Sequence, residues 1–150
     1  MKRISILFKY LKYILKKKSL ISFSKNYKHN QLPVIDVIIN NNKYKFIIDT
    51  GAFYTIVSKD LYHKIKDNNT NELTDYCVSV SGLDGVKIDT VLFITSISFN
   101  KSNKEYQVVC QACDNIDLKT GDRKIDGLLG YHFLANNNAV LDLDKLYLLV

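Results

Sequence analysis

A carboxylate, a hydroxyl and a glycine stand together at Asp49, Thr50 and Gly51, between two apolar stretches of the sequence. The apolar run 46–48 leads into Asp49, and apolar residues resume at Phe53. A charge set between core-forming segments costs free energy unless a partner or a reaction uses it. A glycine two positions after the carboxylate permits a sharp turn, which would direct Asp49 out of the core into a cleft.

The chemistry open to this aspartate depends on a second carboxylate. Two carboxylates in contact cannot both ionise cheaply, so one of them keeps a proton. Such a pair can deprotonate a water molecule and protonate a leaving group, as peptide hydrolysis requires without a metal or a covalent nucleophile. No other Asp precedes Thr-Gly, since Asp89 and Thr90 are followed by Val91. The second carboxylate is therefore expected from Asp49 of another copy.

Short strands with turn signals are expected to position these groups. The sequence predicts a hairpin over residues 33–49 around Asn-Asn-Asn-Lys, and a short helix after Ser58 as N-cap. Further strands are predicted at 75–99, with a glycine-bearing turn, and at 106–113. Residues 125–150 read as a strand, a glycine-bounded turn, a short helix and a closing hairpin. This pattern is typical of a small all-β barrel or sandwich.

Two landmarks carry a resemblance to a known family. The segment Ile47–Ser58 resembles the catalytic signature of retropepsin-like aspartic proteases, in which two apolar residues precede Asp-Thr-Gly-Ala. Leu128-Leu129-Gly130 is similar to the apolar-apolar-Gly element near the C-terminus of that family, and it lies 81 residues after Asp49. The resemblance covers about residues 32–150. It implies an all-β fold, a small closed barrel of the retropepsin-like acid protease type with one or two short helices.

The resemblance also implies a role for each matching residue. Asp49 would be catalytic, the Thr50 hydroxyl would tie two such loops together across a dimer, and Gly51 would let each loop approach its partner. The flap that closes over substrate would be formed by Gly82, Leu83, Asp84 and Gly85. The active site would be supported by Ala52, Leu128, Leu129 and Gly130. The implied activity is that of a homodimeric aspartic endopeptidase acting on polypeptides, without a cofactor or metal.

Two readings from other classes stay open. The same fold could serve as a non-catalytic dimerisation or peptide-binding module, with Asp49 capping a turn. Alternatively, the function could lie in the N-terminal arm, as in a membrane-surface protein. Asp142 and Asp144 alternate with Leu141 and Leu143, which places them on the outer face of a strand and not in a second catalytic motif.

The cysteines and histidines offer weaker candidates. Cys110 and Cys113 have the spacing of a redox or metal pair, but no second such pair accompanies them. We interpret them as ordinary thiols of a strand. The three histidines show no spacing typical of a metal site or a catalytic triad.

Composition separates the arm from the rest of the chain. The net charge of +6 over 150 residues is uneven, because residues 1–30 hold nine Lys or Arg and no Asp or Glu. The remainder is mildly acidic, so nucleic acid is not expected as a ligand. An odd count of three cysteines favours a reducing compartment, and we expect a cytoplasmic protein.

The basic arm has apolar residues at helical spacing, with lysines on the other face. It is too short and too charged to span a bilayer. Residues 1–18 could form an amphipathic helix on an anionic membrane surface, a docking helix, a helix packed on its own domain, or a disordered leader. Residues 22–31 read as a linker. The expected organisation is an arm with its linker, 1–31, and a protease domain, 32–150.

Overall fold

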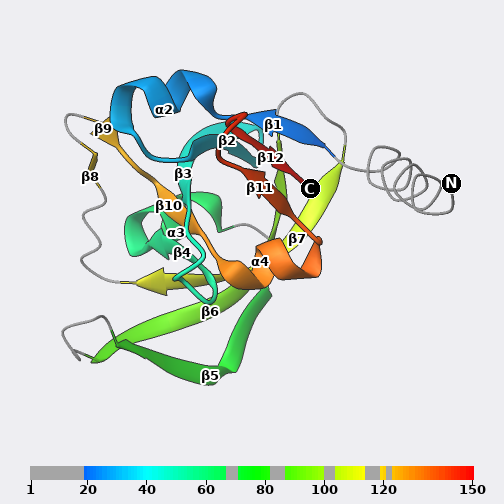
Figure 1. Cartoon of the computed structure of the whole chain (residues 1–150). Coiled ribbons are helices and arrows are strands. Elements are labelled where there is room, and N and C mark those ends of the chain that lie inside the picture. Colours follow the sequence, from blue (N-terminus) through cyan, green and yellow to red (C-terminus); the bar gives the residue numbers. More distant parts are fainter. Residues whose placement is uncertain (1–18, 67–70, 82–86, 100–103, 114–118, 121–122) are drawn as a thin grey trace, which may run out of the picture.

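The structure is a computed structural model that describes residues 19–66, 71–81, 87–99, 104–113, 119–120 and 123–150 (Figure 1). Most of these residues lie in strands. The strands are β1 (Leu20–Ser22), β2 (Val34–Ile39), β3 (Asn42–Ile48), β4 (Thr55–Ser58), β5 (Asn71–Ser81), β6 (Lys87–Ser98), β7 (Glu105–Cys113), β8 (Lys119–Thr120), β9 (Arg123–Lys124), β10 (Gly127–Leu129), β11 (Val140–Asp142) and β12 (Tyr147–Leu149). The helices are α2 (Ser24–Asn30), α3 (Lys59–Ile65) and α4 (Tyr131–Asn136).

Six strands close into a barrel. They follow the order β2-β3-β10-β4-β7-β6, and a pairing of Ile38 on β2 with Ser98 on β6 joins the two ends. β5 continues the sheet outward from β6, and a second sheet has the order β1-β12-β11. The predicted all-β barrel of the retropepsin-like type is confirmed.

The β2–β3 hairpin forms where the sequence predicted it. Its turn is made by Asn40 and Asn41, which both have positive φ, 49° and 63°. Asparagine tolerates this left-handed conformation better than most residues, and the resulting turn matches the twist of the two strands. The predicted helix after Ser58 is also present, because the Ser58 side chain accepts a hydrogen bond of 3.1 Å from the Leu61 N–H.

Aromatic side chains fill the interior. Phe46, Phe93, Phe99 and Phe133 are all at most 2% exposed. The rings of Phe99 and Phe133 meet edge to face, with 6.0 Å between their centroids. Because Phe133 belongs to α4, this contact fixes the helix against the barrel wall.

The prediction of a linker over residues 22–31 is wrong. β1 pairs antiparallel with β12, and α2 follows it directly. Ile21 and Phe23 are almost fully buried, and the Asn26 side chain donates a hydrogen bond of 2.8 Å to the Val34 carbonyl. Burial of these apolar side chains, together with Tyr27, which packs against the same core, stabilises the segment on the barrel. Residues 1–18, and with them the predicted membrane contact, lie outside the described residues.

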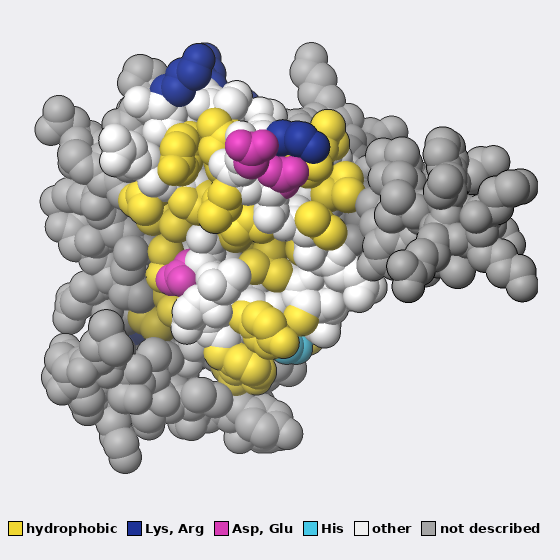
Figure 2. All heavy atoms as spheres, viewed as in Figure 1, with side chains coloured by type: hydrophobic (Ala, Val, Ile, Leu, Met, Phe, Trp, Pro, Cys, Tyr) yellow, Lys and Arg dark blue, Asp and Glu magenta, His cyan; other side chains and the backbone are white. Residues whose placement is uncertain are grey.

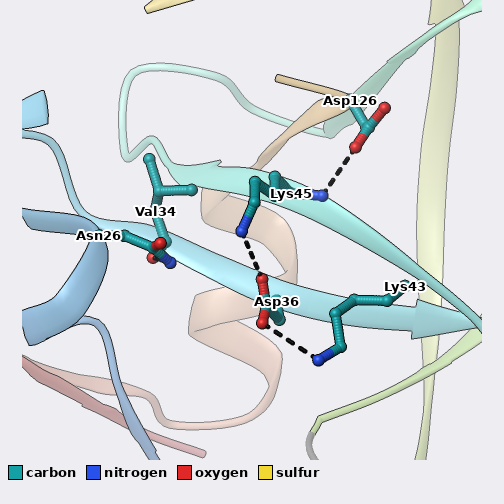
Figure 3. A network of polar contacts seen from close by, with 6 residues as sticks. All are labelled: Asn26, Val34, Asp36, Lys43, Lys45 and Asp126. Atoms are coloured by element: carbon teal, nitrogen blue, oxygen red, sulfur yellow. Dashed lines mark hydrogen bonds and ion pairs between the residues drawn. The ribbon is translucent and has the colours of Figure 1, made fainter. Parts of the chain in front are cut away.

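A network of charges lies on the outer surface of the β2–β3 hairpin (Figure 3). The Asp36 carboxylate accepts a hydrogen bond of 3.0 Å from Lys45 Nζ and lies 3.4 Å from Lys43 Nζ. The Lys45 N–H donates to the Asp126 carboxylate at 2.8 Å. Partial burial alone would raise the pKa of Asp36, but the two lysines together hold it below its usual value.

No helix among the residues described here is long and apolar enough to cross a membrane.

Candidate active site

Asp49 lies where β3 ends, at the start of a loop that leads into β4. Its backbone N–H donates a hydrogen bond of 3.0 Å to the Leu129 carbonyl, and its Oδ1 accepts one of 2.8 Å from the Gly51 N–H. The first bond fixes the backbone, and the second fixes the carboxylate. Asp49 is half-buried, whereas Thr50 and Gly51 are exposed. The loop therefore presents this motif at the surface on a rigid support.

β10 runs between the strands that enter and leave this loop. It pairs parallel with β3 and antiparallel with β4. Gly127 permits this close approach, because a Cβ there would lie 2.5 Å from the Phe46 ring and 2.6 Å from the Ile56 carbonyl oxygen. Leu129 is fully buried beneath the loop, and Leu128 is half-buried.

The start of α4 is tied to the same loop. The N–H groups of Tyr131 and His132 donate to the carbonyls of Ala52 and Phe53, at 2.7 and 2.8 Å. Gly130, between β10 and α4, leaves no room for a side chain, since a Cβ would lie 2.2 Å from the Tyr54 carbonyl oxygen. These contacts hold the loop and the helix as one unit.

The structure brings the two landmarks of the sequence together. Asp49, Thr50, Gly51 and Ala52 lie beside Leu128, Leu129 and Gly130, although about 80 residues separate them in sequence. The candidate flap residues Gly82, Leu83, Asp84 and Gly85 fall outside the described residues. The hairpin that carries them is present, because β5 and β6 remain paired as far as Ser81 and Lys87.

One residue of the site went unnoticed in the sequence. Thr55 is 1% exposed, and its hydroxyl accepts a hydrogen bond of 3.2 Å from the Gly130 N–H. It links the start of β4 to the end of β10. The only signal in the sequence was a hydroxyl in an otherwise apolar strand, and that does not reveal a partner 75 residues away.

The electrostatics around Asp49 are simple. Within the described part of the chain, Asp49 forms no ion pair, and no group of three or more His, Cys, Asp or Glu could hold a metal ion. Asp49 remains a fixed, partly exposed carboxylate.

An open hollow of about 390 Å³ begins beside the motif. Its lining includes Thr50 of the loop, Tyr131 and Leu134 of α4, Leu141 of β11 and Leu148 of β12. The hollow is thus shared by the candidate catalytic loop, α4 and the C-terminal sheet.

The two cysteines of β7 are buried in the core. Cys110 and Cys113 are 1% and 2% exposed. Burial raises the pKa of the Cys110 thiol far above its ordinary value, which disfavours the reactive thiolate. Their burial agrees with the interpretation as ordinary thiols.

Comparison with known proteins identifies the family. A family model described as aspartyl protease matches residues 35–133, a span that includes Asp49 and Gly130. The chain belongs to the aspartyl protease family. A search among curated proteins found no match.

Solved structures of proteases share the fold. A retropepsin-like aspartic protease from Rickettsia conorii is 20% identical, with a TM-score of 0.57, and the match covers 89% of this chain and 98% of that one. The EIAV protease complexed with the inhibitor HBY-793 is 19% identical, with a TM-score of 0.54, and the match covers 78% and 98%. At identities of 19% and 20%, the likeness shows that this chain has the retropepsin-like fold.

Proposed function

We propose that the chain is an aspartic endopeptidase that hydrolyses peptide bonds through a water molecule activated by two Asp49 carboxylates, one from each copy of a homodimer. The observation that carries the proposal is the presentation of Asp49. Its carboxylate is held by the Gly51 N–H, within a surface loop, and forms no ion pair with any described residue. A carboxylate used only to cap a turn would not need two further strands and a helix to support it.

The homodimer follows from the number of motifs. Each chain has a single Asp-Thr-Gly, so a pair of carboxylates needs two chains. Thr50 and Gly51 are exposed, which leaves both free to face a second loop. A two-fold axis beside Asp49 brings the same residues of each copy together and completes the site.

In the proposed reaction, the two carboxylates share one proton. The ionised carboxylate takes a proton from water as that water attacks the carbonyl carbon, and the protonated carboxylate gives its proton to the carbonyl oxygen, which forms a tetrahedral diol. When the diol collapses, the C–N bond breaks, the nitrogen takes the proton that came from water, and a diol hydroxyl returns its proton to the other carboxylate. The Thr50 hydroxyls tie the two loops together, and Gly51 permits their close approach. The substrate lies extended, paired through its main chain as an added strand, beneath the flap formed by residues 82–85.

The proposed protease domain spans residues 32–150, with 19–31 folded onto it. The odd number of cysteines supports a reducing compartment such as the cytoplasm. A membrane-surface role for residues 1–18 stays a prediction, which binding of the full chain to anionic vesicles would test.

The decisive experiment mixes wild-type chains with Asp49→Asn chains at constant total concentration. If each active site needs two Asp49 carboxylates, an equal mixture forms random dimers, and activity falls to about a quarter of the wild-type value. Sites built within single chains would give about half. Cleavage of a peptide library, followed by mass spectrometry, provides the readout.

Two further measurements separate the proposal from its alternatives. Activity should survive EDTA and thiol-blocking reagents, and it should be inhibited by a hydroxyl-bearing mimic of the tetrahedral intermediate. Loss of activity to EDTA alone would point to a metal enzyme. Binding of peptides without any cleavage, equal in the wild type and in Asp49→Asn, would favour the non-catalytic peptide-binding module.

A further inference from the structure

The C-terminal sheet, β1-β12-β11, has two faces with different surroundings. Because neighbouring side chains along a strand point to opposite faces, the register assigns each residue to one of them. The inner face packs against the core, and its row consists of Ile21, Leu148 and Leu141. The outer face points away from the core, and its first row consists of Leu20, Leu149 and Val140.

The outer row is apolar and partly open to solvent. Leu20 is 61% exposed and Val140 is 43% exposed, and Leu149 lies between them. Figure 2 shows hydrophobic side chains gathered on the surface in the region of this sheet. Apolar side chains that continue across three strands and remain exposed mark a surface that another segment or molecule covers.

Carboxylates lie at the other end of the outer face. Asp142 points to this face, because it is two residues beyond Val140 on β11. Lys145 Nζ lies 3.9 Å from the Asp142 carboxylate, but the Lys145 side chain is 69% exposed, so this ion pair balances the charge only weakly. Asp144 is exposed in the turn between β11 and β12. A ligand for this face therefore needs an apolar side and positive charges.

The chain itself supplies such a segment at the edge of the sheet. Residues 1–18 join the described chain at Ser19, directly before Leu20. The Val150 N–H donates a hydrogen bond of 3.0 Å to the Ser19 carbonyl, and the Ser19 N–H donates one to the Val150 carbonyl. The arm therefore begins beside the outer row. A segment tethered this closely has a high effective concentration at the face.

The arm has the composition and the length that this face requires. Residues 1–18 hold seven Lys or Arg and no Asp or Glu, and their apolar residues recur at helical spacing. In a helix, a segment of this length would span about 27 Å. Three strands side by side span about 10 Å between the outer two. The arm is therefore long enough to turn back and cross the whole sheet.

Two other occupants fit the outer face less well. A membrane of anionic lipids would meet Asp142 and Asp144 with charges of the same sign. A second copy placed against Thr50, as the proposed dyad requires, lies on the side of the inner face, since Thr50 lines the hollow together with Leu141 and Leu148. Charge and position both favour the basic arm.

We propose that residues 1–18 fold back as an amphipathic helix over the outer face of the C-terminal sheet. The apolar side of the arm covers Leu20, Leu149 and Val140, and its lysines lie beside the acidic turn after β11. The inference goes beyond the proposed function, because it needs neither the dyad nor a substrate. In this arrangement the apolar side of the arm is occupied by the chain's own sheet and is not available to a membrane surface.

The test measures how fast a thiol reagent labels the side chain introduced by Val140→Cys, in the full chain with Asp49→Asn so that cleavage plays no part. Leu11→Asp places a charge on the apolar side of the arm and should raise the labelling rate about tenfold, because the covered state opens more often. Tyr13→Asp is the matched control, since residues two positions apart point to opposite sides of a helix. It adds the same charge and should leave the rate unchanged.

Two more variants locate the effect on the surface. Asp144→Lys should raise the labelling rate of Val140→Cys about threefold, because repulsion replaces attraction at the turn. Asn42→Cys, at the exposed turn end of the β2–β3 hairpin, provides a reference thiol whose labelling should not respond to Leu11→Asp. Mass spectrometry of peptides identifies the labelled site and shows that the arm is intact, and circular dichroism controls for folding.

Each outcome supports the proposal or overturns it. Slow labelling of Val140→Cys at every protein concentration, relieved by Leu11→Asp and not by Tyr13→Asp, supports it. Equal rates with the wild-type arm and with Leu11→Asp would overturn it, and protection that then appears only with anionic vesicles would assign the arm to a membrane surface instead. Protection that disappears on dilution would assign the outer face to a second copy. An unchanged rate in Asp144→Lys would overturn the charge pairing at the turn.

Discussion

Two aspartates on the same β2–β3 hairpin occupy opposite environments. Asp36 lies on the outer surface of the hairpin between two lysines, with Nζ atoms at 3.0 and 3.4 Å (Figure 3). Asp49 lies where the hairpin ends, and its Oδ1 accepts a hydrogen bond from the Gly51 N–H. The charge of Asp36 is thus balanced within the chain, whereas among the described residues Asp49 has no basic partner.

The supporting structure differs in the same way. The ion pairs of Asp36 involve side chains that are between 33% and 64% exposed, and water competes for all of them. The loop of Asp49 is held by backbone hydrogen bonds to β10 and α4 and by glycines that leave no room for side chains. Rigid support around an unbalanced charge is the arrangement of a site that reserves its carboxylate for a partner or a substrate.

The largest expected effect is a loss of activity when Asp49, but not Asp36, is replaced. Asp49→Asn should lower the rate of peptide hydrolysis about a thousandfold or more, because an amide can act neither as base nor as acid. Asp36→Asn makes the same chemical change on the same hairpin and should leave the rate within about twofold, since surface ion pairs carry little energy. Initial rates on one reporter peptide, at equal dimer concentration, give both values.

Unfolding in urea supplies the control for folding. Asp49→Asn should unfold at the urea concentration of the wild type to within experimental error. A variant that is inactive because it is unfolded would say nothing of the dyad. Equal loss of activity in the two variants would show that Asp49 has no special role.

A smaller effect separates the two glycines of the site. In Gly130→Ala the new Cβ would lie 2.2 Å from the Tyr54 carbonyl oxygen, so the backbone must move, and the free energy of unfolding should fall by about 3 kcal/mol. In Gly51→Ala the nearest atom is Asp49 Oδ1, at 3.2 Å. That variant should keep its stability within about 1 kcal/mol and lose activity, because it displaces the carboxylate. Urea unfolding and initial rates together distinguish the two, and the reverse ranking would contradict this account of the site.

The parts of the molecule that depend on local sequence could be predicted. The β2–β3 hairpin follows from two β-rich apolar runs on either side of a group of asparagines. The N-cap at Ser58 follows from a hydroxyl residue just before a short helical segment. The Asp-Thr-Gly motif and Leu128-Leu129-Gly130 are each made of adjacent residues, so both can be identified directly in the sequence.

The parts that depend on contacts distant in sequence could not be predicted. The pairing of β1 with β12 joins residues about 130 positions apart, and the composition of residues 22–31 gave no sign of it. Leu129, whose carbonyl accepts the hydrogen bond from the Asp49 N–H, becomes a neighbour of Asp49 only when β10 inserts between β3 and β4. Composition and periodicity describe each strand, but they do not fix the order in which the strands pair.

The smallest expected effect is the contribution of Asp36 to the free energy of unfolding, and its dependence on pH distinguishes Asp36 from Asp49. Since the lysines hold the pKa of Asp36 below its usual value of 3.8, the folded state favours the ionised form. The resulting stability is present above the pKa of the unfolded chain and is lost as the pH falls through the lower pKa of the folded state.

The difference in unfolding free energy between the wild type and Asp36→Asn should therefore be about 0.5 kcal/mol at pH 6 and 0.1 M salt, after allowance for solvent screening. It should shrink towards zero as the pH falls through the lowered pKa of Asp36 in the folded state, because the protonated side chain no longer pairs with the lysines. At 1 M salt it should be smaller throughout, because the ion pairs are open to water. Urea unfolding of both proteins from pH 6 to pH 2.5 measures the difference directly. A difference that persists at the lowest pH would show that Asp36 acts through packing and not through its charge, and the contrast with Asp49 would then rest on position alone.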